Sequence, residues 1–103
     1  MIVCLNDKDY EVDEHGFLKQ SETWDERAAE DLASAEGLAL TEHHWKVIGF
    51  LRGYWTDNGV PPPVRKVCNV TGFSLKYIYQ LFPAGPAMGA CKIAGLPRPR
   101  RCI

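Results

Sequence analysis

Two cysteines near the end of the chain are the residues best suited to covalent chemistry. Cys102 is the penultimate residue, and Cys91 lies eleven positions before it. The thiolate form of cysteine is the nucleophile, and nearby positive charge favours that form. Arg100 and Arg101 directly precede Cys102. Because exposed charges are screened by salt, we expect them to activate Cys102 only modestly unless the tail docks on a partner.

The segment between the two cysteines predicts an extended arm. Pro97 and Pro99 alternate with arginines, and such a pattern favours a polyproline II backbone of about 3.1 Å per residue. The interval from Gly95 to Cys102 would then span roughly 20 Å. Gly95 is expected to end the preceding helix, because glycine tolerates positive φ. We predict one helical domain over residues 1–94 and a mobile C-terminal arm over 95–103.

A thiol on such an arm could react with the thiol at its root. If the arm folds back, the two cysteines can form a disulfide once their Cα atoms come within about 7 Å. Cys102 would receive or carry a sulfur atom, and Cys91 would attack it, releasing sulfide or another reduced product. Two simpler interpretations stay open: Cys102 is an ordinary terminal residue, and Cys91 is a small buried apolar residue. The spacings CxxC and HxxxH are absent, so we predict no metal and no cofactor.

The charge of the chain is divided between its two halves. Residues 1–58 carry thirteen acids and five bases, whereas residues 59–103 carry seven bases and no acid. This asymmetry indicates an anionic partner, either an acidic protein surface or nucleic acid. The two halves could also attract each other within one domain. The predicted partner-binding residues are all basic: Arg65, Lys66, Lys92, Arg98, Arg100 and Arg101.

Length and composition indicate one small cytoplasmic domain. A chain of 103 residues can bury a single modest core. No run approaches the roughly twenty apolar residues that a spanning helix needs, so no membrane insertion is expected. The N-terminus shows no basic region followed by an apolar stretch. Cys4 and Cys68 bring the cysteine count to four, and without an export signal we expect reduced or catalytic thiols.

Local patterns predict a mostly helical α+β fold: a small N-terminal β-hairpin, about five helices and the arm. We expect the hairpin to turn over residues 6–9, with Cys4 packing on its strand, and a second turn over residues 13–16. The expected helices are 21–37, 42–58, 64–70, 75–82 and 87–94, the first capped by Ser21 or Thr23. The third and fourth helices, joined by a glycine-containing turn, predict a helix-turn-helix. His43 and His44 are interpreted as surface residues.

Several motifs together resemble the DsrC/TusE sulfur-carrier family. They are Leu81-Phe-Pro-Ala-Gly-Pro-Ala87, Ala90-Cys-Lys-Ile-Ala-Gly-Leu-Pro97, the blocks 40–45 and 62–65, and the penultimate Cys102. The resemblance extends over nearly the whole chain. It implies a small, mostly helical fold with an N-terminal hairpin and a mobile C-terminal arm.

The resemblance also implies roles for the two cysteines. In the DsrC branch the terminal cysteine, Cys102 here, enters a channel of dissimilatory sulfite reductase and bears the sulfur. Cys91 is then the resolving partner, and a membrane-linked oxidoreductase reduces the resulting disulfide or trisulfide. In the TusE branch only the terminal cysteine is typical, and it relays persulfide sulfur toward 2-thiouridine in tRNA. Because both positions are present, the resemblance favours a DsrC-like protein that acts as a co-substrate more than as an independent catalyst.

Two other classes of function remain as alternatives. A redox-sensing DNA-binding regulator would use residues 63–82, but it leaves Cys102 without a purpose, so DNA binding is the weaker expectation. A thiol-disulfide oxidoreductase normally carries CxxC. The longer interval between Cys91 and Cys102 makes ring closure slower and dependent on geometry.

Overall fold

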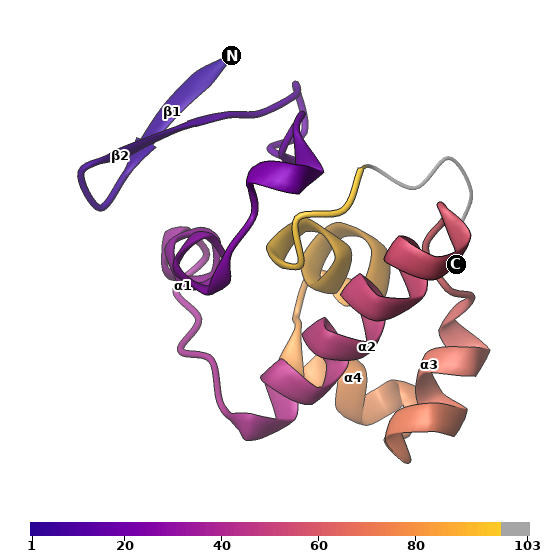
Figure 1. The fold of residues 1–103 in the computed structure, drawn as a ribbon. Coiled ribbons are helices and arrows are strands. Elements are labelled where there is room, and N and C mark those ends of the chain that lie inside the picture. The colour runs from indigo at the N-terminus through magenta and orange to yellow at the C-terminus, as the bar shows by residue number, and fades with distance from the viewer. Residues whose placement is uncertain (98–103) are drawn as a thin grey trace.

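The computed structural model describes residues 1–97, in which an N-terminal hairpin lies beside a group of helices packed around a buried segment near the C-terminus (Figure 1). This confirms the predicted mostly helical α+β class with a small hairpin. Residues 98–103, which include most of the predicted arm, lie outside the described residues. In chain order the elements are β1 Ile2–Leu5, β2 Lys8–Glu11, η1 Ser21–Thr23, α1 Glu26–Ala35, α2 Glu42–Asn58, α3 Val64–Thr71, α4 Leu75–Leu81 and η2 Pro86–Cys91.

The hairpin is closed by a two-residue turn. β1 and β2 pair antiparallel, with Leu5 opposite Lys8. Asn6 and Asp7 between them have φ of 51° and 65°, the combination that matches the right-handed twist of paired strands. The predicted four-residue turn was therefore too long. The prediction that Cys4 packs inside was also wrong, because alternation along the strand turns its side chain to solvent.

A buried carboxylate ties the hairpin to α1. Asp31 is only 4% exposed. It accepts a hydrogen bond from the Tyr10 hydroxyl at 2.5 Å and one from the Asn6 amide at 2.7 Å. These hydrogen bonds, that from Tyr10 above all, lower the pKa of Asp31. Arg27 lies one turn earlier on α1, with its Nε 3.6 Å from the carboxylate.

The first α-helix begins later than the sequence predicted. Residues 21–23 form a separate 3-10 turn, and Trp24 then adopts an extended backbone with φ −67° and ψ 141°. Asp25 caps α1, since its side chain accepts the Ala28 N–H at 2.8 Å. A carboxylate at this position satisfies an otherwise unpaired helix donor. The predicted helix over 21–37, with Ser21 or Thr23 as its cap, was therefore wrong in its first part, and Trp24 lies outside the helix.

α2 is the central helix, and its first turn corrects the interpretation of one histidine. His44 is 6% exposed. Its Nδ1 accepts the Thr41 backbone N–H at 3.1 Å, so in the neutral ring Nε2 carries the proton and donates to the Leu81 carbonyl at 2.7 Å. His44 thus links the start of α2 to the end of α4 and is not a surface residue. His43 is exposed as predicted, with its Nδ1 2.5 Å from the Tyr77 hydroxyl.

α3 and α4 form the predicted helix-turn-helix. α3 ends at Gly72, whose φ is 78°. Ser74 then caps α4 by accepting the Tyr77 N–H at 3.1 Å. α3 packs against both α2 and α4. None of the helices within residues 1–97 is long and apolar enough to cross a membrane.

Candidate functional site

Cys91 is the one predicted reactive cysteine whose position can be seen. It is the last residue of η2, and its exposed fraction is 0%, like that of Ile93 and Ala94 after it. Burial raises the pKa of its thiol to about 12. A shielded, protonated thiol is a poor nucleophile. In this position the Cys91 thiol is therefore shielded from other reactants.

The segment that carries Cys91 is a π-helical turn, a form that occurs frequently at functional sites. Gly85 precedes it with φ 93°, and Pro86 begins it. Gly89 fits closely against the chain itself, since a Cβ there would lie 3.1 Å from the Cβ of Phe82. The small residue thus lets η2 approach the end of α4 and brings Cys91 into the core.

The helical backbone after Cys91 ends in a Schellman motif, in which a left-handed residue lets two N–H groups reach back to the last carbonyls. Gly95 has φ 73°. Its N–H donates to the Lys92 carbonyl at 3.1 Å, and the Leu96 N–H donates to the Cys91 carbonyl at 3.0 Å. The prediction that Gly95 ends this helix is confirmed. Gly95 and Leu96 are both buried, whereas Pro97 is exposed.

Two side chains from distant parts of the sequence cap the remaining carbonyls of this helix end. Trp24 Nε1 donates to the Ile93 carbonyl at 2.9 Å. Arg52 Nη1 donates to the Ala94 carbonyl at 3.3 Å and to the Ser21 carbonyl at 3.2 Å. Carbonyls at a helix C-terminus lack partners within the helix, and a cation there is favourable. We call Trp24 and Arg52 the C-terminal clamp.

The clamp is also held together by ring stacking. The guanidinium carbon of Arg52 lies 4.5 Å from the centre of the Trp24 ring and 5.6 Å from that of Trp55. Burial lowers the pKa of Arg52. The indole of Trp24 also covers Gly95, because a Cβ there would lie 2.3 Å from Trp24 Cδ1. Only glycine fits under this ring.

Neither clamp residue was predicted. Trp24 falls within the helix expected over residues 21–37, but α1 begins only at Glu26. Arg52 had a visible signal, since it lies four residues after Ile48 and three before Trp55 on a largely apolar face of α2. A single cation at such a position indicates a specific partner. No local pattern indicates which carbonyls Arg52 would meet.

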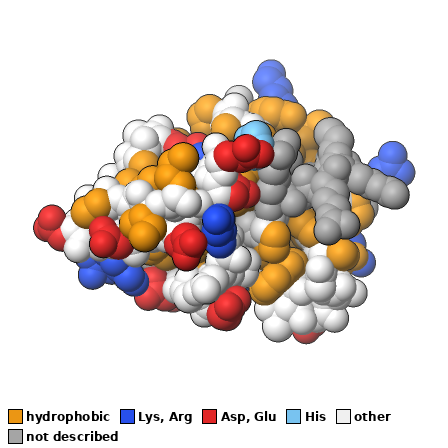
Figure 2. Space-filling view, turned by 90° about the horizontal axis from the view of Figure 1, so that it is seen from above, with side chains coloured by type: hydrophobic (Ala, Val, Ile, Leu, Met, Phe, Trp, Pro, Cys, Tyr) orange, Lys and Arg blue, Asp and Glu red, His pale blue; other side chains and the backbone are white. Residues whose placement is uncertain are grey.

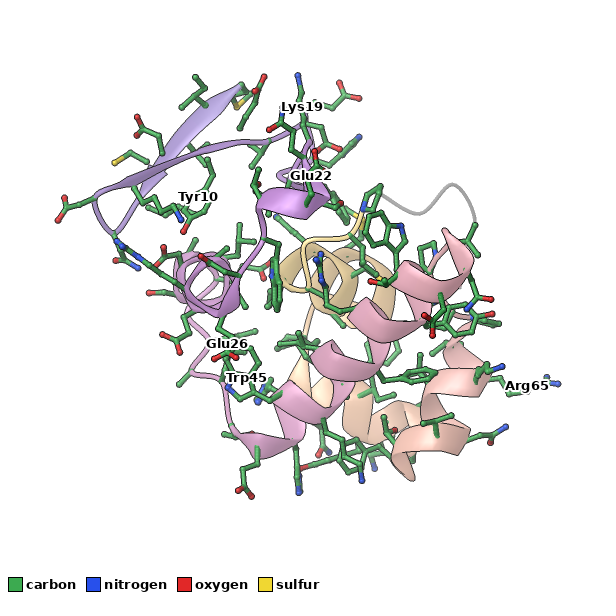
Figure 3. All side chains as sticks on the ribbon, viewed as in Figure 1. Tyr10, Lys19, Glu22, Glu26, Trp45 and Arg65 are labelled. Carbon is green, nitrogen blue, oxygen red and sulfur yellow. The ribbon has the colours of Figure 1, made fainter. Side chains whose placement is uncertain are left out.

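The predicted partner-binding residues are spread over the molecule. Lys92, next to Cys91, extends toward the turn at Gly16, where a Cβ would lie 2.8 Å from its Nζ. Burial raises the pKa of Glu36, and the charge of Lys92 offsets part of that effect. Arg65 and Lys66 lie together on α3, on the wall of a shallow hollow. Figure 3 shows Arg65 pointing away from the body of the molecule. The other predicted residues, Arg98, Arg100, Arg101 and Cys102, are outside the described part of the chain.

Acidic side chains gather on the side of the hairpin and α1 (Figure 2). Ion pairs seen there, among them Lys8 with Asp25 and Lys19 with Glu11, join residues of the acidic half to one another. Within residues 1–97, Cys4, Cys68 and Cys91 are free thiols, and no three metal-ligating side chains come together.

Comparison with known proteins places this geometry in a family. A family model described as DsrC-like protein matches residues 4–103. The gamma subunit of dissimilatory-type sulfite reductase from Nitratidesulfovibrio vulgaris is 44% identical over 102 residues, covering 98% of this chain and 97% of the relative. The sulfurtransferase TusE of Escherichia coli strain K12 is 38% identical over 109 residues, covering 99% and 100%.

Solved structures agree over the full length. The oxidized gamma subunit of dissimilatory sulfite reductase (DsrC) from Archaeoglobus fulgidus superposes with a TM-score of 0.89 at 44% identity, with all of both chains covered. DsrC from Pyrobaculum aerophilum superposes with a TM-score of 0.81 at 48% identity, covering 100% of this chain and 95% of that one. Both the sequence match and the fold extend from the hairpin to the C-terminal segment, and the chain therefore belongs to the DsrC-like protein family.

Proposed function

We propose that this protein is a sulfur carrier that bears a persulfide or trisulfide on Cys102 and serves as co-substrate of dissimilatory sulfite reductase or a related sulfur-transfer system. The observation that carries the proposal is a family match over residues 4–103 in a chain with cysteines at both 91 and 102. The protein is then a partner that delivers sulfur, more than a catalyst that turns over alone.

The chemistry of one cycle balances with a persulfide donor. The Cys102 thiolate attacks the outer sulfur of the donor persulfide, the donor leaves as a thiolate, and Cys102 holds the transferred sulfur. The Cys91 thiolate then attacks Cys102 Sγ, the persulfide S–S bond breaks, and hydrosulfide leaves. The carried sulfur is reduced to sulfide while the two cysteines are oxidised to a disulfide. Two electrons from an external dithiol or a membrane-linked reductase restore both thiols.

The burial of Cys91 separates the loading of sulfur on Cys102 from its later release. Because burial raises the pKa of the Cys91 thiol to about 12, this thiol is protonated at pH 7. A sulfur loaded on Cys102 is therefore protected from immediate attack by Cys91. Resolution follows only when the Cys91 helix opens, so loading and release are separate events. This separation is what a carrier needs in order to move sulfur between two partners.

The proposed delivery surface is the basic C-terminal half. We propose that residues 95–103 act as the arm, which the buried Gly95 and Leu96 anchor to the body of the protein, and that Arg98, Arg100 and Arg101 guide it to an acidic partner surface, with Lys92 at its root. Arg65 and Lys66 on α3 would add to the same long-range attraction, which mainly raises the association rate. We expect the exchange to take place in the cytoplasm.

A TusE-type relay is the second candidate, favoured by the 38% identity to TusE over 99% of this chain. Its sulfur acceptor would be another relay protein on the route to thiolated tRNA. In that case Cys102 passes its sulfur intact, and Cys91 is dispensable. The two candidates therefore differ in what happens when Cys91 is replaced.

Mass spectrometry of the reduced protein after treatment with a persulfide donor tests the proposal. We expect one added sulfur on the peptide that contains Cys102 and none in Cys102→Ala. Cys91→Ala should still load but should form no intramolecular disulfide, while Cys68→Ala, the matched control, should do both. Sulfur found on Cys4 or Cys68, or an unchanged disulfide in Cys91→Ala, would contradict the assignment.

The helix-turn-helix of α3 and α4 leaves a DNA-binding role as the weakest alternative. Binding through Arg65 and Lys66 to phosphates would weaken steeply as salt is raised. Fluorescence anisotropy with duplex DNA over a range of salt concentrations measures this directly. The absence of salt-sensitive binding would remove the alternative.

A further inference from the structure

The end of the Cys91 helix is held by contacts that come from outside its own segment. Its last two carbonyls are bonded by Trp24, from the linker before α1, and by Arg52, from the middle of α2. Arg52 also reaches back to the Ser21 carbonyl, which joins the two outside elements to each other. Three segments that are distant in sequence therefore meet at the last turn before the C-terminal segment.

These contacts act on a single turn of the chain. The carbonyls of Ile93 and Ala94 accept hydrogen bonds from Trp24 and Arg52. The Trp24 ring covers Gly95, and the guanidinium of Arg52 stacks on that ring. The Leu96 N–H in turn bonds the Cys91 carbonyl. Loss of the outside contacts frees the final turn of the helix while the hairpin, α1 and most of α2 keep their own hydrogen bonds. Such local opening requires less free energy than global unfolding.

We propose that Trp24 and Arg52 are positioning residues that govern when Cys91 becomes accessible, so that breaking the clamp exposes this thiol without unfolding the protein. This inference rests on the proposed function, in which Cys91 is the resolving thiol. The clamp then sets the interval between the loading of Cys102 and the attack by Cys91. A partner that pulls on the segment after Leu96 would act directly on the residues that the clamp holds.

Site-resolved alkylation of the full-length reduced protein tests the inference. The labelling rate of the Cys91 peptide is measured by mass spectrometry at increasing urea concentrations below the unfolding transition. Local opening gives a rate that hardly changes with urea, whereas global opening gives a rate that rises steeply. The urea midpoint of each variant, measured in parallel, reports its global stability.

Arg52→Met keeps the apolar stem of the side chain and removes the charged donor. We expect it to label Cys91 about tenfold to a hundredfold faster in the urea-independent range, the factor that corresponds to losing one charged hydrogen bond. Trp24→Phe keeps a ring over Gly95 but removes the indole donor, and should give a smaller increase. Arg52→Lys, which retains charge at the helix end, should restore part of the protection.

Lys46→Met is the matched control. Lys46 is also a cation on α2, with its Nζ 5.2 Å from the ring of Phe73, but it has no contact with the Cys91 helix end among those observed. Its Cys91 labelling rate should equal that of the unmodified chain. Equal acceleration in Lys46→Met and Arg52→Met, or Cys91 labelling that follows the urea midpoint in every variant, would overturn the inference.

A second readout joins the clamp to the carrier cycle. In sulfur-loaded Arg52→Met, the Cys91–Cys102 disulfide should appear faster by the same factor as the alkylation. If Cys102 takes up no sulfur in any variant, the proposed function fails while the alkylation result still decides the role of the clamp. If loading proceeds but disulfide formation is equally fast with and without Arg52, the clamp does not govern resolution.

Discussion

The thiol of Cys91 should make the protein less stable at alkaline pH in a way that one substitution removes. Burial raises its pKa from the ordinary 9.0 to about 12. Above pH 9 the unfolded chain releases this proton while the folded chain keeps it. The unfolded state then binds fewer protons, so the free energy of unfolding falls as pH rises through this interval.

The size of the effect follows from the two pKa values. Between pH 7.5 and pH 10 the contribution of Cys91 to stability should fall by an amount on the order of 1 kcal/mol. The contribution of Tyr10 to stability also falls as pH rises, because burial and its hydrogen bond to Asp31 raise its pKa as well. Cys91→Ala retains Tyr10 and every other titrating group. The difference between the two proteins therefore isolates Cys91.

Urea unfolding of the reduced chain and of Cys91→Ala at both pH values measures this difference. The variant loses packing at both pH values, and that loss does not depend on pH. We expect the gap in unfolding free energy between the two proteins to shrink by an amount on the order of 1 kcal/mol at pH 10. A constant gap would mean that Cys91 is already accessible in the folded protein, and the proposed order of loading and resolution would fail with it.

Three further predictions concern the contacts that position the site. Gly95→Ala places a Cβ 2.3 Å from an indole carbon of Trp24. Gly37 is the matched control, because its φ of 75° is similar but a Cβ there would meet open space. Urea unfolding should show that Gly95→Ala lowers the unfolding free energy by about 2 kcal/mol more than Gly37→Ala. Asp31→Asn should cost about 1.5–3 kcal/mol at neutral pH. The pKa of Asp31 is lowered in the folded protein. The stability difference between the unmodified chain and Asp31→Asn should therefore disappear as pH falls below about 4 and through the folded pKa, which urea unfolding at a series of acidic pH values measures. His44→Ala should cost about 1–3 kcal/mol and His43→Ala less than about 0.5 kcal/mol by thermal or urea unfolding, since only the former leaves buried hydrogen-bonding groups unpaired.

Local signals predicted most of the elements because each acts over a few residues. Thr41 and Gly59 mark the ends of α2, and Gly95 was correctly expected to end the last helix through its positive φ. The start of α1 was missed because Ser21, Thr23 and Asp25 are all good caps. The choice of Asp25 follows from the position of Trp24, which is fixed by a bond to a residue 69 positions away.

The candidate site was only partly predictable for the same physical reason. Spacing and motif single out the two cysteines as candidates, and the predicted ending of the helix at Gly95 was correct. The burial of Cys91 depends on how η2 packs into the core, which no local pattern encodes. Arg52 and His44 each bond a carbonyl more than thirty-five residues away in sequence. Contacts of this kind are decided by the tertiary fold.

The most direct test of the carrier cycle counts its products. Protein loaded with sulfur on Cys102 is freed from donor and left to react, and released sulfide and the Cys91–Cys102 disulfide are quantified together. If Cys91 resolves the loaded sulfur, we expect one sulfide for each disulfide, and neither product in Cys91→Ala. Undiminished sulfide release from Cys91→Ala, in the absence of any added thiol, would contradict it.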